Sequence, residues 1–309
     1  MRLEGIHHIT AITADAQGNV DFYAGALGLR LVKKTVNQDN PTVYHLFYAD
    51  EEGDPGSDLT FFEYPGIPRG RAGDGMIHRV VWRVGSEEAL DFWSERLDER
   101  GVEAVRVEDR AAARFEDPEG LEHEIVIAEV DDEPLIAEHP EIPAELALQG
   151  FDGACAYAAE PERSRELLEG TLEFSPRDEA LWEASGESRG STYAYHQPPS
   201  QPGLQGAGSV HHIAWASHPT EHEAWRERVV AAGMRPTPVI DRFYFRSVYF
   251  REPSGVLFEI ATIGPGFTID EPGESLGEKL SLPPFLEHLR DEIEPKLTPL
   301  TNPRQTARA

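Results

Sequence analysis

The sequence predicts an α+β fold made of four copies of one β-α-β-β-β unit. Segments in which every second residue is apolar alternate with segments of helical periodicity four times along the chain. A turn that contains both Pro and Gly also recurs at the same place in the second and fourth copies. With 309 residues, the chain is long enough for about two domains.

The first unit extends from Gly5 to about Pro65. Its opening strand has the sequence Ile6-His-His-Ile-Thr-Ala-Ile12, and an amphipathic helix is expected at Ala16–Leu27. Three strand-like segments complete the unit, at Leu29–Val36, Val43–Tyr48 and Asp58–Tyr64.

The second unit, Met76–Val130, repeats this order of elements. A strand at Met76–Val84 precedes a helix at Glu87–Glu99, and Gly101 is expected to end that helix. The third unit, at about Gly150–Pro198, matches the pattern least well, with its helix expected at Glu160–Gly170.

The fourth unit, Ser209–Ile263, is again clear. Its elements are a strand at Val210–Ala216, a helix at Thr220–Ala232 ended by Gly233, and strands at Thr237–Asp241, Tyr244–Arg251 and Val256–Thr262. The turn Phe250–Gly255 matches Phe115–Gly120 of the second unit, since each places Pro and Gly between two strand-like segments. Proline presets such a turn and glycine adopts its unusual dihedral, so the last strand folds back on its neighbour.

The unit boundaries predict two domains of two units each. The first comprises residues 1–130 and the second residues 150–265, with a linker at 131–149 that begins with the acid- and proline-rich segment Asp131–Pro143. Residues 266–309 form a C-terminal tail, in which a helix is expected at Pro284–Leu297.

This arrangement, with a histidine on the first strand and a Pro-Gly hairpin, resembles the vicinal-oxygen-chelate superfamily. That superfamily includes glyoxalase I, extradiol dioxygenases and antibiotic-binding proteins, and the resemblance covers about residues 5–263. It implies that paired units curl into two open, cup-like barrels that can hold a metal.

The repeat allows the opening strands of the units to be aligned with one another. His7–His8 of the first unit then matches His211–His212 of the fourth, whereas the second unit has His78–Arg79 and the third has no histidine at this place. Adjacent residues of a strand point to opposite faces, so only one histidine of each pair can face a shared site. The second of each pair is chosen because its register fits the closing strand and the superfamily pattern.

Aligning the closing strands through the Pro-Gly turn adds a carboxylate. Glu259 of the fourth unit matches Glu124 of the second and approximately Thr60 of the first. A carboxylate on so apolar a strand costs several kcal/mol to bury unless it is paired or metal-bound. The predicted metal ligands are therefore His8, His212 and Glu259.

Two imidazoles and one carboxylate form the facial triad that suits Fe(II), because they leave positions open for dioxygen and a bidentate substrate. The family resemblance implies that Mn(II) can sometimes replace Fe(II). In the second unit Arg79 occupies the place of a ligand, and a cation there repels a metal, so that unit is expected to be structural. The other histidines have no such register and are expected at the surface or in the core: His45, His123, His139, His196, His218, His222 and His288.

This ligand set requires an unusual pairing of units. The first unit should share its barrel with the fourth, and the second with the third. A domain-swapped dimer would satisfy the same geometry, and a homo-oligomer is left open.

Several local strings narrow the resemblance to ring-cleaving dioxygenases that act on hydroquinones. They are Leu3–Thr10, Tyr44–Asp50, Asp54–Gly56, Ser209–Ala214, Asp241–Arg246, Phe258–Thr262 and Gly264–Asp270. The resemblance implies Fe(II), a small aromatic diol of the hydroquinone or catechol type as substrate, and entry of both atoms of O2 into the opened ring.

The resemblance also implies five residues around the metal. Arg242 and a histidine, His7 or His211, would stabilise developing negative charge; Tyr249 would hydrogen-bond the substrate hydroxyl or bound oxygen; and Thr10 would orient a neighbour. Each also has a structural interpretation: Tyr249 as a packed strand residue, Arg242 as the partner of an acid, and the two histidines as residues that face away from the site.

Two other functions are considered. A glyoxalase-like lyase or isomerase normally needs a fourth ligand, and Thr60 occupies that place, while Glu63 should face the opposite side of its strand. A non-catalytic binding protein would lack the ligand triad.

Composition excludes other classes. The formal charge of −28 leaves no basic face for nucleic acid, and no apolar run is long enough to cross a membrane. The acids are spread along the whole chain, which is typical of a surface adapted to high salt, although an acidic partner-binding surface would also need them. The single cysteine, Cys155, and the lack of an apolar leader indicate a cytoplasmic protein.

Overall fold

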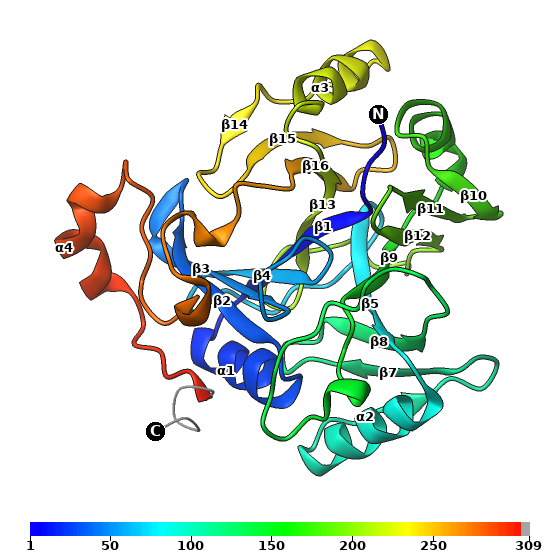
Figure 1. Ribbon diagram of the computed structural model, residues 1–309. Helices are drawn as coiled ribbons and strands as arrows, with labels where there is room; N and C mark the ends of the chain where they lie inside the picture. The colour runs from blue at the N-terminus through cyan, green and yellow to red at the C-terminus, as the bar shows by residue number, and fades with distance from the viewer. Residues whose placement is uncertain (304–309) are drawn as a thin grey trace.

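The computed structural model describes residues 1–303, whose strands form two eight-stranded sheets (Figure 1). The first sheet has the order β14-β15-β16-β13-β1-β4-β3-β2 and the second the order β10-β11-β12-β9-β5-β8-β7-β6. The strands of the first sheet are β1 (Ile6–Thr13), β2 (Arg30–Asn37), β3 (Asn40–Ala49), β4 (Asp58–Glu63), β13 (Val210–Ser217), β14 (Ile240–Asp241), β15 (Arg246–Arg251) and β16 (Leu257–Thr262). Those of the second are β5 (Met76–Val84), β6 (Val105–Arg106), β7 (Ala112–Glu116), β8 (Glu122–Ile127), β9 (Phe151–Tyr157), β10 (Ser175–Asp178), β11 (Leu181–Ser185) and β12 (Gly190–His196).

Each sheet combines two units through their opening strands. β1 pairs antiparallel with β13, and β5 pairs antiparallel with β9. Within each unit the opening strand is parallel to the closing strand, as in β1 with β4 and β13 with β16. The predicted pairing of the first unit with the fourth, and of the second with the third, is therefore confirmed within a single chain. The α+β fold of four units is confirmed as well. The domain boundaries stay a prediction. Each sheet takes strands from both sides of residues 131–149.

The helix of each unit connects its first two strands. α2 (Glu87–Glu99) begins at Ser86, whose hydroxyl accepts a hydrogen bond from the Ala89 amide, and α3 (His222–Ala231) is its counterpart in the fourth unit. Gly101 and Gly233 follow these helices with φ of 74° and 82°, as expected for glycines that end a helix.

The helices of the first and third units are less regular than expected. α1 (Ala16–Val20) widens into η1 (Asp21–Ala26), where the Leu27 amide bonds the Phe22 carbonyl, five residues back. The third unit has η3 (Pro161–Ser164), a 3-10 turn, and then η4 (Glu166–Thr171), where the Leu172 amide bonds Leu167 in the same way. Such single wide turns are π-bulges, which a periodicity pattern does not distinguish from an α-helix.

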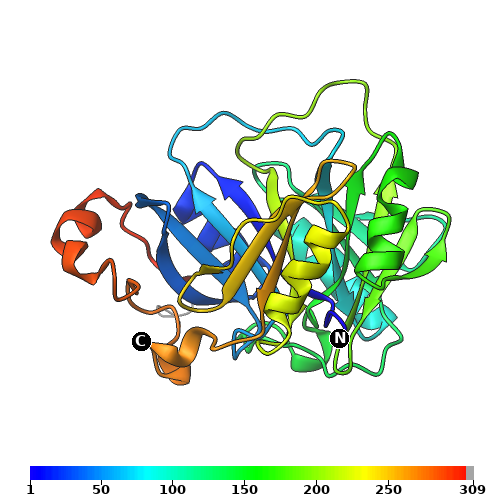
Figure 2. The same cartoon turned by 90° about the horizontal axis from the view of Figure 1, so that it is seen from above.

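The C-terminal tail lies beside the first sheet, on the side away from the second (Figure 2). Its expected helix at Pro284–Leu297 is present over Glu287–Lys296 as a short α-helix between two 3-10 turns, and Pro295, which has no amide hydrogen, lies in the second of these turns. Lys33 of β2 is fully buried and anchors the tail through Asp270 and Glu271. The remaining short elements are η2 (Ala144–Leu146), η5 (Phe267–Ile269), η6 (Gly273–Ser275), η7 (Glu287–Leu289), α4 (Arg290–Ile293) and η8 (Glu294–Lys296). The tail prediction for residues 304–309 lies outside the described residues.

Two hydrophobic clusters hold the sheets. The larger joins all four units and includes Ile9, Val80, Ala154 and Ile213. The smaller lies within the first sheet and combines Phe47 with Tyr244, Phe245 and Phe267. Among residues 1–303 no helix is both long and apolar enough to span a lipid bilayer.

Candidate metal centre

Three adjacent strands of the first sheet bring His8, His212 and Glu259 together. His8 Nε2 lies 3.2 Å from His212 Nε2, and the Glu259 carboxylate lies 3.3 Å from the first and 2.9 Å from the second. Their exposed fractions are 1%, 4% and 0%, respectively. The three predicted ligands therefore meet in one buried place, within one chain.

The strand register explains why the internal alignment worked. Thr10, two residues after His8, is paired with Thr60, and Ala214, two residues after His212, is paired with Glu259. Thr60 and Glu259 thus occupy equivalent positions in the first and fourth units.

A β-bulge directly precedes each of the two histidines predicted as ligands. In the β1–β13 ladder, Ile6 and His8 face consecutive residues of β13, so His7 is the extra residue, and His211 is skipped in the same way between His212 and Val210. Bulges interrupt the alternation of side chains and often occur next to active sites. The alternation rule alone therefore does not describe these two residues.

His7 and His211, the bulged histidines, contact the Nδ1 atoms of His8 and His212, on the side of each ring away from Glu259. His7 Nδ1 lies 2.9 Å from His8 Nδ1, and His211 Nδ1 lies 2.8 Å from His212 Nδ1. His7 is buried and donates its Nε2 hydrogen to the Thr262 carbonyl at 3.1 Å, which leaves its Nδ1 free to accept from His8. Burial is the main cause that lowers the pKa of His7, to about 3, which favours this neutral form.

These contacts set the hydrogen positions at His8. Because His7 Nδ1 accepts from His8 Nδ1–H, His8 Nε2 carries a lone pair that faces Glu259, and the same arrangement in the His211–His212 pair would present the lone pair of His212 Nε2. Both carboxylate oxygens also lack a hydrogen-bond donor. Three electron-donor atoms so close together repel one another unless a cation lies between them.

The donor set fits such a cation. An ion bound at about 2.1 Å to three mutually adjacent ligands holds them about 3.0 Å apart, close to the separations observed. Two imidazole nitrogens and one carboxylate on one face match the ligand type of non-haem Fe(II) sites. A second group of possible ligands, formed by His7, His8 and Asp58, shares His8 with the first.

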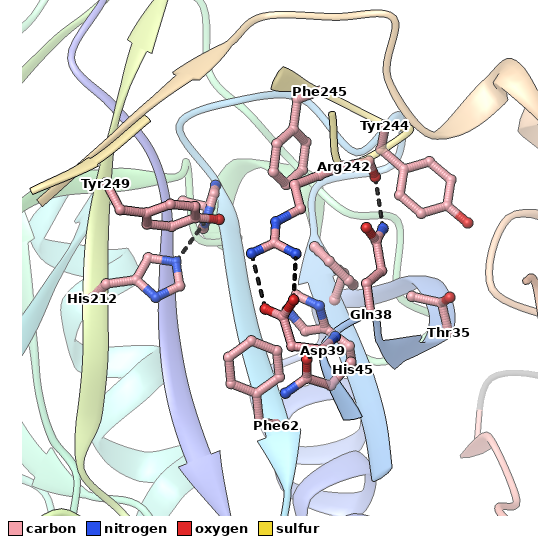
Figure 3. Close-up of a pocket in the computed structure, with 13 residues that line it drawn as sticks. Thr35, Gln38, Asp39, His45, Phe62, His212, Arg242, Tyr244, Phe245 and Tyr249 are labelled. Atoms are coloured by element: carbon pink, nitrogen blue, oxygen red, sulfur yellow. Dashed lines mark hydrogen bonds and ion pairs between the residues drawn. The ribbon is translucent and has the colours of Figure 1, made fainter. Parts of the chain in front are cut away.

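A pocket lies beside the predicted ligands, and His8 and His212 form part of its lining (Figure 3). Tyr249 of β15 borders it beside His212, with 5.7 Å between the two ring centres. Arg242 follows β14; its guanidinium pairs with Asp39 at 3.0 Å and lies 5.5 Å from the centre of the Tyr249 ring. The lining consists of His8, Thr35, Asn37, Gln38, Asp39, His45, Phe47, Phe62, His212, Arg242, Tyr244, Phe245 and Tyr249.

Thr10 and Thr60 lie side by side beneath this pocket. The Thr60 hydroxyl donates to Thr10 at 2.8 Å and contacts His45 Nε2 at 2.9 Å. Thr60 stands at the place of a fourth ligand, and its hydroxyl is already hydrogen-bonded to Thr10 and His45. Of the five residues predicted around the metal, Arg242 and Tyr249 line the pocket, His7 and His211 contact the ligands, and Thr10 lies below.

The sequence reasoning missed His45, which was expected at the surface or in the core. His45 instead lines the pocket on β3, with Phe47 and Phe62 packed against its ring at 4.0 and 4.3 Å between centres. The alternation of side chains along β3 could have indicated this position. Tyr44 and Leu46 belong to the large core, so His45 and Phe47 face the other side of the sheet.

Comparison with known proteins agrees with this geometry. The Glyoxalase/Bleomycin resistance protein/Dioxygenase superfamily matches residues 5–125 and 150–260. The chain belongs to this superfamily. Chlorohydroquinone/hydroquinone 1,2-dioxygenase of Sphingobium indicum is 34% identical over 94% of the chain and 95% of its own length. MhqA of Bacillus subtilis (strain 168), provisionally named a ring-cleaving dioxygenase, is 39% identical over 97% of the chain and 100% of its own length.

Solved structures of the superfamily give the same picture. A Bacillus subtilis protein, provisionally named a dioxygenase, superimposes with a TM-score of 0.91 at 39% identity, over 97% of this chain and 98% of its own. Glyoxalase I of Zea mays superimposes with a TM-score of 0.55 at 14% identity, over 84% and 92%. The latter likeness shows the shared fold alone.

Proposed function

We propose that this protein is a non-haem Fe(II)-dependent ring-cleaving dioxygenase that inserts both atoms of O2 into a small aromatic diol of the hydroquinone or catechol type. The observation that carries the proposal is the buried set of His8, His212 and Glu259, whose lone pairs converge beneath a pocket with aromatic walls. The names of the relatives, two of them dioxygenases of aromatic rings, support it. Mn(II) is a possible substitute for Fe(II).

Three protein ligands suit this chemistry better than four. When bound, Fe(II) would supply open positions at which substrate and O2 meet, and an electron path between them. The position that a fourth ligand would take belongs to Thr60, whose hydroxyl is engaged with Thr10 and His45. This contact supports a dioxygenase over a glyoxalase-like lyase.

The surrounding residues would prepare the site for an anionic substrate. His7 and His211 hold the ligand imidazoles in the tautomer that presents Nε2. Arg242 carries a fixed positive charge at the pocket wall, where it would stabilise the diol in its deprotonated form. The Tyr249 hydroxyl would hydrogen-bond a substrate or dioxygen oxygen atom. Phe47, with its neighbouring aromatic rings, would exclude water.

The cellular setting is proposed from composition. Cys155 is buried and is the only cysteine, which agrees with a reducing cytoplasm. The net charge of −28 argues against nucleic acid as a partner, which leaves the diol and O2 as the expected ligands.

Anaerobic reconstitution tests the proposal. The protein is loaded with Fe(II), and oxygen uptake is followed with hydroquinone, methylhydroquinone, chlorohydroquinone and catechol. We expect one O2 consumed per ring opened and no uptake by His212→Ala. Absence of uptake with all four compounds in a protein that holds one Fe(II) would reject the proposal.

A further inference from the structure

His45 is a pocket residue for which the proposed function has no use. It lies on β3, two strands from β1, whereas Tyr249 lies on β15 on the other side of the ligand strands. Figure 3 shows His45 and Phe62 on one side of the pocket and His212 with Tyr249 on the other. His45 is thus the imidazole that faces the ligands across the pocket.

Hydrogen bonding leaves one nitrogen of His45 available. The Thr60 hydroxyl donates its hydrogen to Thr10, so its oxygen accepts from His45 Nε2–H at 2.9 Å. In a neutral imidazole this leaves a lone pair on Nδ1. Within residues 1–303, Nδ1 of His45 makes no hydrogen bond, although the ring itself is held between Phe47 and Phe62.

The other imidazoles of the site differ in this respect. Both nitrogens of His8 and of His212 already have contacts, Nδ1 with the neighbouring histidine and Nε2 with Glu259, where a metal would bind. His45 also has no counterpart in the fourth unit. Its partner across the strands is Phe62, and the equivalent pair in the fourth unit is Ser247 with Ala261. The first unit therefore lacks the carboxylate of the fourth but gains a hydrogen-bond acceptor.

Neutral His45 is favoured by its surroundings. Burial and the charges of His8, His212 and Arg242 hold the pKa of His45 well below its usual range. A neutral imidazole accepts a hydrogen bond from a phenol, whereas an imidazolium does not.

We propose that His45 Nδ1 accepts the hydrogen bond of the substrate hydroxyl that is not bound at the metal, and that this contact selects para-diols. A hydroquinone that binds through one oxygen projects its second hydroxyl across the ring, away from the ligands. The two hydroxyls of a catechol are adjacent, so both point toward the metal and neither reaches the opposite wall. The inference rests on the proposed function, because it requires a diol bound at His8, His212 and Glu259.

Two substitutions separate the two nitrogens of His45. His45→Asn can place its amide oxygen where Nδ1 lies but loses the contact with Thr60. His45→Gln reaches Thr60 but has no acceptor at the place of Nδ1. The matched pair therefore distinguishes an acceptor for substrate from a support for Thr60.

The test is anaerobic binding to the Fe(II)-loaded enzyme, with hydroquinone, 4-fluorophenol and catechol as probes. 4-Fluorophenol has nearly the shape of hydroquinone but lacks the second hydroxyl hydrogen. We expect wild type and His45→Asn to bind hydroquinone roughly 10- to 100-fold more tightly than 4-fluorophenol, and His45→Gln to reduce this ratio to near one. Catechol affinity should be the same in all three proteins.

The affinity ratio is insensitive to misfolding, because general damage to the fold weakens the binding of hydroquinone and of 4-fluorophenol by the same factor. A wild-type ratio near one, or a ratio retained in His45→Gln and lost in His45→Asn, would overturn the inference. These outcomes are distinct from failure of the proposed function. If wild-type enzyme consumes O2 with hydroquinone but the ratio is unaffected by His45→Gln, only the role of His45 is rejected. If no diol supports uptake, the dioxygenase proposal fails first.

Discussion

The two sheets share one plan but differ at the position where a metal would bind. In the first sheet, the residue two positions after His8 on β1 pairs with Thr60 of β4. In the second sheet, the residue two positions after Arg79 on β5 pairs with Glu124 of β8. The Arg79 guanidinium lies 3.1 Å from Glu124, so an organic cation fills the place that a metal ion would take. In the same fold, the charge of a buried carboxylate is balanced by arginine in the second sheet and would be balanced by a metal ion in the first.

The third unit completes this contrast. In the β5–β9 ladder Val81 faces Gly153, at the place where Thr10 faces His212 in the first sheet. The position equivalent to Glu259 is Ala194, which pairs with Cys155. Of the two positions in the second sheet that are equivalent to Thr60 and Glu259, only that of the second unit is a carboxylate, Glu124, and arginines rather than imidazoles face it.

Removal of the two equivalent glutamates should have different consequences, and Glu259 should have the larger. Without Glu259, a buried site holds only two neutral imidazoles and cannot balance a divalent cation. We expect Glu259→Ala to lose bound Fe(II) and to reduce oxygen uptake at least 1000-fold, roughly the catalytic contribution of a metal that supplies several kcal/mol. Metal content by mass spectrometry and the oxygen electrode measure both effects. Full metal loading in this variant would contradict the ligand assignment.

Glu124→Gln should instead act on stability. Glu124 is fully buried and contacts Arg79 and, at 2.7 Å, Arg114. Loss of its charge leaves Arg79 with only the more exposed Glu122 as a carboxylate partner, so we expect the free energy of unfolding to fall by about 2 kcal/mol. Urea unfolding measures this change. Oxygen uptake per bound Fe(II) should stay at the wild-type value, and its loss would mean that the second sheet takes part in the reaction.

The bulged histidines offer a second matched pair. His7 and His78 are the extra residues of equivalent bulges in β1 and β5, but only His7 contacts a ligand imidazole. His7→Phe should weaken Fe(II) binding roughly 10- to 100-fold, because His8 loses the partner that fixes its tautomer. His78→Phe should leave affinity unchanged. Competition with a chelator gives both values, and equal losses would indicate a general effect of the bulge.

Thr60 tests whether three ligands are required. Thr60→Glu places a carboxylate at the position equivalent to Glu259 and should close the site as a fourth ligand. We expect Fe(II) to be retained while oxygen uptake falls about tenfold or more, because a catalytic ion needs an open position. Thr60→Val is the control, since it removes the hydroxyl without offering a ligand. An active Thr60→Glu enzyme would show that this position does not face the metal.

Much of the first sheet could be predicted because its units repeat. An internal alignment shows which residues occupy equivalent positions, and together with the superfamily pattern it placed His8, His212 and Glu259 at one site. It also required the pairing of the first unit with the fourth, which the strand order confirms. The β-bulges were not visible in the sequence, so the alternation rule did not predict that His7 Nδ1 and His8 Nδ1 would meet.

Features without a repeat counterpart were harder to predict. His45 has no equivalent histidine in the other units, so a search for repeated residues passed over it. The C-terminal helix expected at Pro284–Leu297 is present but shorter and irregular, with 3-10 turns on both sides of α4, which apolar spacing does not reveal. The π-bulge of η4 likewise depends on local hydrogen bonds that periodicity does not encode.

The most direct test of the account is the position of iron in crystals of the Fe(II)-loaded protein, located by anomalous diffraction at the iron edge. We predict one peak per chain, within bonding distance of His8 Nε2, His212 Nε2 and the Glu259 carboxylate, and none beside Arg79 and Glu124. A peak at the group formed by His7, His8 and Asp58, a peak in the second sheet, or no peak in protein that consumes O2 would contradict it.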